Sequence, residues 1–333
     1  MISIWNAAGP RGKAFCLALA LVLVAAPLVA DRYLLSVLIL VFYFAYLGQA
    51  WNVLMGLVGQ LSLGHALYLG LGAYISAGLW TLYGVGPWIG VFIAIPVAAI
   101  AGLFVGWLGW RFAIEGVYFA LLTIAFAEFT RIGFDNLQIT GASAGLSMSV
   151  NSPGFDKWWN LGGGPLEYYY LSLIMAVAAT ILVAYLRQSP LGYRWLAVRE
   201  DPEAARAVGI NIFRARMIAM LISASMTSVG GVFYGFYYHN LFPSQVFDMG
   251  RSIELIMAPI IGGLGTVFGP VLGAFILTPL GEGLTRLTEM LGIDTPGVKL
   301  IFSGLFLMVI ISLRPDGVWP WLARRLGLTG ARK

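Results

Sequence analysis

Two glutamates lie inside long apolar stretches, where a carboxylate could hold a proton or pair with a cation. Glu128 is three residues before Arg131, and Arg251 is three residues before Glu254. Side chains three apart share one face of a helix and can form an ion pair. A charge in apolar surroundings is costly and usually faces a cavity or a partner. The spacing therefore favours two interfacial ion pairs, and proton relays at Glu128 or Glu254 are the alternative.

The motifs of common enzyme active sites are missing from the sequence. It contains no GxSxG, HExxH or CxxC pattern and no GxxxxGK[ST] phosphate loop. The single Cys16 cannot form an internal disulfide, and His65 and His239 lack the short spacing of zinc ligands. We therefore expect no enzymatic activity, no metal site and no cofactor in this chain, so that any ATP would be bound by another subunit.

Polar side chains and glycines occur together at two places within apolar sequence. Polar side chains in such places satisfy the backbone groups that a broken membrane helix leaves without partners. We expect these residues to mark helix breaks, and we expect the histidine among them to be buried and hydrogen-bonded. Lining of a translocation path is the alternative for all of them. The set comprises Asn52, Gln60, Ser62, Gly64, His65, Gly263 and Gly265.

An internal echo links the two glycine-containing regions. Leu63-Gly64 is followed six residues later by Leu-Gly-Ala-Tyr-Ile at 71–75, and Leu264-Gly265 is followed at the same distance by Leu-Gly-Ala-Phe-Ile at 272–276. Glycine-interrupted helices at matching positions of two repeats point to the transport path in many transporters. The echo favours two related halves running in the same direction, and chance similarity among 42 glycines is the alternative.

The stretch 188–214 is the most informative polar segment. Asp201 suits a helix N-cap, Pro202 suits the first helical position, and Glu203 in the first turn would interact well with the helix dipole. Gly209 can end the helix in the left-handed conformation that other residues resist. A short helix with a small-residue face could enter a groove on a partner protein, and a solvated linker helix is the alternative.

The composition places these residues in a membrane protein. Hydrophobic residues make up 59% of the 333 residues and charged residues only 11%, and no Asp, Glu, Lys or Arg occurs from Tyr33 to Trp110. No soluble fold covers that much surface without charge, so a soluble enzyme, a fibrous protein, a disordered chain and a nucleic-acid binder are excluded. The net charge of +5 fits basic cytoplasmic loops of an inner-membrane protein.

The apolar stretches predict an all-α, polytopic fold with about ten passes. Stretch 252–285 is too long for one helix, and we expect two short helices meeting at a glycine-rich break. Residues 14–30 are expected to be a retained span, with a cleaved signal peptide as the alternative. The candidate spans are 14–30, 34–55, 66–82, 88–110, 116–135, 166–187, 217–239, 252–285 and 297–313.

Ten passes place both termini on one side, and most of the basic residues then lie on that side as well. The positive-inside rule assigns this side to the cytoplasm. We therefore expect a single transmembrane domain over 1–333, with 188–214 as a cytoplasmic loop and 136–165 as an external loop, for which a docking surface for a partner is the alternative.

Several motifs together resemble one transporter family. The pattern Glu203-Ala204-Ala205 with Gly209 is similar to the EAA-xxx-G pattern in permease subunits of ABC importers. Three further stretches, at 59–66, 116–128 and 262–270, resemble the LivM-type permeases of branched-chain amino acid importers, and the resemblance covers about 46–313.

This resemblance implies a permease subunit in the inner membrane of a prokaryote. Its partners would be two ATP-binding subunits, a second permease subunit and a periplasmic binding protein. The residues coupled to the ATPase would be Arg199, Glu203, Ala204, Ala205 and Gly209.

One departure from the family concerns a Thr-Gly-Gly-x-x-Gly stretch, because Ala142 stands at its second glycine. Permeases of the same superfamily for urea, amides or aromatic acids are therefore an alternative. A proton-coupled secondary transporter that uses Glu128 or Glu254 is the alternative from a different class. It would leave the helix from Glu203 to Gly209 without a role.

Overall fold

The computed structural model describes residues 22–149, 160–162, 164–290 and 298–325. It is helical almost throughout, so the predicted all-α class is confirmed. Most of the predicted first span and Cys16 lie outside the described residues.

The longer helices are α3 (Arg32–Asn52), α4 (His65–Tyr83), α5 (Pro87–Arg111), α6 (Val117–Asn136), α7 (Pro165–Gln188), α10 (Ile212–Tyr238), α12 (Met249–Gly262), α13 (Gly269–Met290) and α14 (Val298–Leu313). Shorter elements connect them: η1 (Ala26–Leu28), the π-helical turn η2 (Val53–Leu57), η3 (Gln138–Thr140), η4 (Ala142–Ala144), β1 (Leu146–Ser147), α8 (Pro190–Glu200), α9 (Pro202–Ala207), β2 (Asn240–Leu241), α11 (Pro243–Val246) and α15 (Val318–Arg325). Strands β1 and β2 pair antiparallel.

Five of the described helices are long and apolar enough to cross a membrane, namely α3 with η2, α5, α6, α7 and α10. The bent pair Gly304–Leu313 and Val318–Arg325 would make a sixth. A polytopic membrane protein is therefore confirmed, but the predicted count of ten passes is not.

The long apolar stretch 252–285 is split into two helices, as predicted. Helix α12 has 14 residues, fewer than the roughly 20 that span a bilayer. Helix α13 has 22 residues, so the prediction that both helices would be short is wrong for the second. Residues 263–268 form the break between them.

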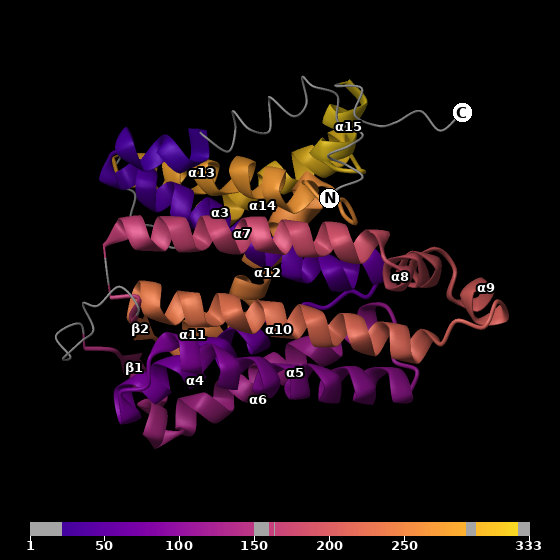
Figure 1. Ribbon diagram of the computed structural model, residues 1–333, viewed down its shortest axis with the longest axis horizontal. Coiled ribbons are helices and arrows are strands. Elements are labelled where there is room, and N and C mark those ends of the chain that lie inside the picture. The colour runs from indigo at the N-terminus through magenta and orange to yellow at the C-terminus, as the bar shows by residue number, and fades with distance from the viewer. Residues whose placement is uncertain (1–21, 150–159, 163, 291–297, 326–333) are drawn as a thin grey trace.

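The helices form two groups, as Figure 1 shows. Helices α3, α7, α13 and α14 form one group, helices α10, α4, α5 and α6 form the other, and α12 lies between them. Helices α8 and α9 project from one end of the molecule, and β1 and β2 lie at the opposite end. We call these the α9 end and the β1–β2 end.

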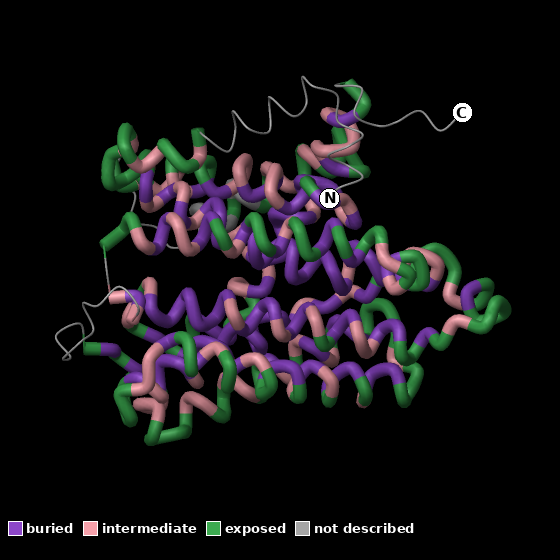
Figure 2. The backbone as a smooth tube through the Cα atoms, viewed as in Figure 1, coloured by how far each residue is buried: buried purple, intermediate pink, exposed green. Residues whose placement is uncertain are grey.

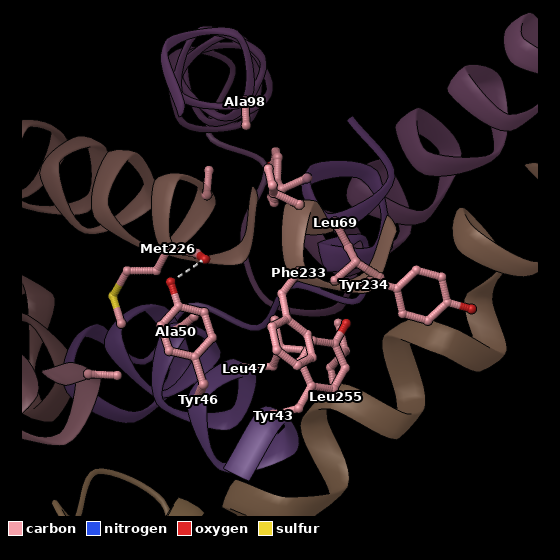
Figure 3. Packing of buried hydrophobic residues seen from close by; sticks show 14 of the residues in the cluster. Tyr43, Tyr46, Leu47, Ala50, Leu69, Ala98, Met226, Phe233, Tyr234 and Leu255 are labelled. Atoms are coloured by element: carbon pink, nitrogen blue, oxygen red, sulfur yellow. Dashed lines mark hydrogen bonds between the residues drawn. The ribbon is translucent and has the colours of Figure 1, made fainter. Parts of the chain in front are cut away.

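The core lies where the two helix groups meet, and exposed residues collect on the outer faces and at the ends (Figure 2). In the close view of Figure 3, Tyr46 of α3 donates a hydrogen bond of 2.7 Å to the Met226 carbonyl of α10. Tyr43 stacks on Phe233 at 5.3 Å between ring centroids. Aromatic burial of this kind, together with close backbone packing, holds membrane helices together.

The two copies of the echo run in the same direction, as predicted. Helix α13 is antiparallel to α3, because Val267 lies beside Gln49 while Arg286 covers the ring of Tyr33 at 4.6 Å. Helix α4 is parallel to α10, which itself returns antiparallel to α3 (Figure 1). Both α4 and α13 therefore run against α3.

Candidate functional site: the α8–α9 loop and the two helix breaks

The short helix α9 begins and ends as its sequence predicts. The Asp201 carboxylate accepts hydrogen bonds from the backbone N–H groups of Glu203 at 2.9 Å and Ala204 at 3.1 Å. Pro202 is the first helical residue, where its missing N–H costs nothing. Gly209 has a φ of 85°, the left-handed conformation expected after the helix end.

The residues on the buried and exposed faces of α9 are not the ones that the sequence led us to expect. Ala205, expected on the small face offered to a partner, is buried within the chain itself, and its carbonyl accepts from the N–H of Ile210. The outward residues include Ala204, Ala207 and Val208. Any partner of α9 would therefore contact this neighbouring face instead.

Helix α8 is anchored to the membrane-spanning helices at its centre. The indole N–H of Trp195, which is fully buried, donates 2.8 Å to the Ala215 carbonyl in α10. Ser189 caps the start of α8 by accepting from the N–H of Gly192 at 3.2 Å. Helix α8 is therefore joined directly to α10.

Arg199, in the last turn of α8, reaches from this loop to both helix breaks. Its Nη1 donates a hydrogen bond to the carbonyl of Gly56 in the π-helical turn η2. Its side-chain stem and Cα also lie beside Gly59, and a Cβ built on Gly265 would overlap its guanidinium, at 2.2 Å from Nη1. One side chain therefore contacts the loop, the end of α3 and the break between α12 and α13.

The second break, 263–268, is held by amide side chains of α3. The Asn52 amide accepts from the N–H of Gly265 at 2.8 Å and donates to the Thr266 carbonyl at 2.9 Å. One turn earlier, Gln49 donates to the Val267 carbonyl at 2.6 Å. Asn52 and Gln49 are fully buried. They satisfy backbone groups that the break exposes, as expected for Asn52.

The C-terminal segment also contacts this break. A Cβ built on Gly317 would lie 2.4 Å from the Cα of Gly263, and one built on Gly263 would lie 2.9 Å from the ring of Pro320. Gly263 and Gly265 have φ values of 124° and 71°. Both positions therefore require glycine, for conformation as well as for space.

The first break, 58–64, is held by side chains of the spanning helices. Trp51 donates to the Ser62 carbonyl at 2.8 Å, and Trp110 donates to the Gln60 side chain at 3.1 Å. A Cβ on Gly64 would lie 2.1 Å from the Thr123 carbonyl oxygen, so the backbones touch at this point. Gln60, Ser62 and Gly64 thus lie in a helix break, as expected.

His65 begins α4 and is buried and hydrogen-bonded on both ring nitrogens. Ser62 Oγ lies 3.1 Å from Nδ1, and Ser223 Oγ lies 2.8 Å from Nε2. The Ser223 hydroxyl donates a hydrogen bond of 2.7 Å to the Ala50 carbonyl. The Ser223 oxygen must therefore accept from Nε2–H, which leaves Nδ1 to accept from Ser62. This arrangement fits the expected structural role of a neutral histidine.

Both predicted ion pairs are present. Arg131 contacts Glu128 at 2.5 Å, and Arg251 contacts Glu254 at 2.6 Å. Arg131 also pairs with Asp135 at 2.6 Å. Among the described residues, no group of three or more His, Cys, Asp or Glu side chains could hold a metal ion.

Several residues of these networks escaped the sequence analysis. They are Gln49, Thr123, Ser223 and Ser252, the last of which accepts from the N–H of Ala66 at 3.0 Å. Their signal was a polar side chain in an apolar helix. That signal does not reveal the partner, which lies in another helix for Ser223 and Ser252 and in a helix break for Gln49 and Thr123.

The departure at Ala142 has a structural counterpart. Ala142 has a φ of 48°, a left-handed conformation that favours glycine, and it follows Gly141 at 83°. The chain therefore keeps a backbone shape suited to glycine after the glycine has been replaced.

A family model described as branched-chain amino acid transport system / permease component matches residues 33–311. The chain is 30% identical to the high-affinity branched-chain amino acid transport system permease protein LivM of Escherichia coli, over 97% of this chain and 79% of the relative. It is 24% identical to LivH of Salmonella typhimurium, over 83% and 90%. It is 23% identical to a probable LivM of Methanocaldococcus jannaschii, over 82% and 84%. No solved structure matches.

Proposed function

We propose that this chain carries branched-chain amino acids across the membrane. The premise is that the chain belongs to the family of branched-chain amino acid transport system permease components. Family membership makes it a permease subunit of an ABC importer, in agreement with the resemblance seen in the sequence. Such a subunit works with other subunits. The proposed set is two ATP-binding subunits that hold the ATP, a second permease subunit and a periplasmic binding protein.

The observation that carries this proposal is the contact of Arg199 with both helix breaks. An importer must turn ATP-driven movement outside the membrane into movement of helices inside it. Here the α8–α9 loop touches η2 through the Gly56 carbonyl and touches the second break beside Gly265. A push on α9 would thereby change the packing of η2 and of the second break together.

The outward face of α9 is the proposed contact for an ATP-binding subunit. It presents Ala204, Ala207 and Val208, and the side chain of Val208 is 76% exposed. The exposed pair of Glu203 and Arg206, 3.0 Å apart, borders this face. Small side chains let a backbone approach closely, and an exposed valine gives an apolar contact in the centre of the face.

The proton-coupled alternative has less support. Glu128 and Glu254 each pair with an arginine three residues away, so both carboxylates already have a structural partner. That alternative also gives no role to the contacts of Arg199.

Co-purification tests the coupling proposal. The chain is expressed with the candidate ATP-binding subunits, and Ala204→Trp and Gly209→Val are compared with the wild type for ATPase retention and leucine uptake. Trp on the outward face should block docking, and valine at a φ of 85° should distort the turn after α9. Tyr193→Trp, at an exposed site in α8, is the control. Wild-type uptake by both variants would show that this loop is only a linker.

Cysteine labelling tests the proposed orientation, in which the termini and the α9 end face the cytoplasm of a prokaryotic inner membrane. In a Cys16→Ala background, Val208→Cys should resist an impermeant thiol reagent in intact cells. Tyr83→Cys, in the last turn of α4 at the β1–β2 end of the molecule, should react. Both positions are more than 70% exposed, so accessibility within the protein does not limit labelling. Labelling of Val208→Cys alone would reverse the orientation.

A further inference from the structure

An ion pair in the first turns of α12 and three tyrosines from α3 and α10 form a cluster near the β1–β2 end. Arg251 pairs with Glu254 at 2.6 Å, donates to the Tyr234 hydroxyl at 3.1 Å and lies 5.0 Å from the centre of that ring. Tyr238 packs on Tyr234 at 4.5 Å, and Tyr43 lies 6.4 Å from it, between ring centroids. We call these five residues the Arg251 cluster.

Two donors of the cluster have no acceptor. Among the described residues, neither the Tyr43 hydroxyl nor Arg251 Nε has a hydrogen-bond partner, although both atoms are buried. Tyr43 as a whole is 2% exposed. A buried donor without an acceptor loses its hydrogen bonds to water and gains none in return, so folded proteins rarely keep one without a reason. Two such donors in one cluster indicate a site for an anionic group.

The charged part of the cluster remains partly accessible. The side chains of Arg251 and Glu254 are 19% and 26% exposed, and Tyr238 is 41% exposed. A charged pair on a membrane helix that is not covered by its own chain faces a cavity or a partner, because hydrocarbon would penalise it strongly. The charged side chains of the cluster are therefore partly accessible, whereas Tyr43 is buried.

We propose that the Arg251 cluster binds a zwitterionic α-amino acid with an apolar side chain, as a station on the translocation path. Arg251 and the Tyr43 hydroxyl donate to the α-carboxylate, and Glu254 accepts from the α-ammonium group. The faces of Tyr234 and Tyr238 contact the aliphatic side chain. This inference rests on the proposed function and deepens it, since it names where this chain contacts the substrate.

The position of the cluster connects it with the coupling route. Arg251 lies in the first turn of α12, and Gly262 ends the same helix at the second break. Asn52 and Arg199 hold or contact that break. Helix α12 thus joins Arg251 and Glu254 to the second break over 14 residues, with Pro259 inside the helix. A substrate site at the far end of α12 is thus placed to open or close with the α8–α9 loop.

Direct binding is the decisive measurement. The purified full complex, without binding protein, is studied by saturation-transfer NMR with leucine, with 4-methylpentanoate, which lacks the ammonium group, and with 3-methylbutylamine, which lacks the carboxylate. Leucine should give the strongest signal. Glu254→Gln and Arg251→Lys should each weaken leucine binding about tenfold, as expected for loss of a hydrogen bond to a charged group. Tyr43→Phe should weaken it less, about threefold to tenfold.

Matched variants separate binding from structure. Glu128→Gln breaks the corresponding pair on α6, and Tyr46→Phe removes a bonded tyrosine hydroxyl elsewhere on α3. Neither should change leucine binding. Unchanged leucine binding in Glu254→Gln and Tyr43→Phe would overturn the proposal. Loss of the second permease subunit from the purified Glu254→Gln complex would also overturn it, by showing that the cluster is a subunit contact.

Uptake in proteoliposomes with binding protein distinguishes this inference from the proposed function. Absence of ATP-driven leucine uptake by the wild type would contradict the proposed function itself. If the wild type shows uptake and both Glu254→Gln and Arg251→Lys retain it in full, only the proposed substrate site at the Arg251 cluster is contradicted. Uptake lowered about tenfold in both, with Glu128→Gln unaffected, is the result expected from the lost contacts.

Discussion

The first break, 58–64, and the second break, 263–268, share an echo in sequence but are held in different ways. Trp51, Trp110 and the backbone at Thr123 hold the first from neighbouring spanning helices. The second depends on the amides of Asn52 and Gln49 in α3, on the segment around Gly317 and on Arg199 of the α8–α9 loop. Arg199 also lies beside Gly59 in the first break, but the hydrogen bonds that hold the first break come from inside the helix bundle, whereas the second break is also contacted by the segment around Gly317.

This difference indicates a division of labour between two similar sequences. We expect a break fixed by buried side chains and a backbone contact to keep one arrangement and to act as a joint of the scaffold. A break bounded by a charged side chain from a projecting loop can respond when that loop moves. Coupling in a transporter needs an element with two arrangements that both sites can bias. The second break meets that description better than the first.

The largest expected effect comes from filling either break. Gly64→Leu would place a Cβ 2.1 Å from the Thr123 carbonyl oxygen, and Gly265→Leu would place one 2.5 Å from the Gly56 carbonyl oxygen at a φ of 71°. Backbone must move in both cases, so we expect little folded protein in the membrane and no uptake. Gly283→Leu in α13, which has no neighbour within 4 Å, is the control for helix propensity and lipid contact. Immunoblots of membranes and uptake assays measure both; normal uptake by the two variants would remove the meaning given to the echo.

Asn52→Leu should have the next largest effect, confined to the second break. It leaves the Gly265 N–H and the Thr266 carbonyl without a partner while keeping a similar side-chain volume. Each lost partner costs about 1–3 kcal/mol, so the unfolding temperature of the purified complex should fall clearly. Asn52→Gln keeps both an amide donor and an amide acceptor, so its unfolding temperature should fall less. Equal stability of Asn52→Leu and the wild type would show that the second break does not depend on α3.

Arg199→Met should affect coupling more than stability. Methionine keeps the apolar stem but cannot donate to the Gly56 carbonyl. Because Arg199 is largely exposed, the lost bond should change the unfolding temperature little. Uptake should fall about tenfold while the ATP-binding subunits remain attached, and ATP hydrolysis should continue without transport. Arg194→Met, an exposed arginine of the same helix, is the control. Unchanged uptake per ATP hydrolysed in Arg199→Met would place the coupling contact elsewhere.

Ser62→Ala should have the smallest effect, and it tests the first break as Arg199→Met tests the second. It removes the 3.1 Å hydrogen bond to His65 Nδ1 in the first break and leaves the backbone contact at Gly64 in place. We expect a loss of about 1 kcal/mol of stability and no change in uptake per ATP hydrolysed. Uncoupling by Ser62→Ala, measured as in the Arg199→Met experiment, would assign the first break a moving role as well.

The sequence alone determined the features that depend on neighbours along the chain. Asp201 and Pro202 start a helix and Gly209 ends it, because capping and a positive φ involve only residues a few positions apart. The ion pairs of Glu128 and Glu254 follow from their spacing of three. The membrane class and the family follow from composition and from motifs in a fixed order.

Only the tertiary structure decided which distant residues meet. Arg199 and Gly56 are 143 positions apart, and Asn52 and Gly265 are 213 apart, so no local pattern connects them. The inward orientation of Ala205 depends on how α8 and α10 pack around α9, which its helical period cannot specify. The open donors of Tyr43 and Arg251 arise in the same way, because satisfaction of a buried donor is a property of its surroundings and not of its position in the chain.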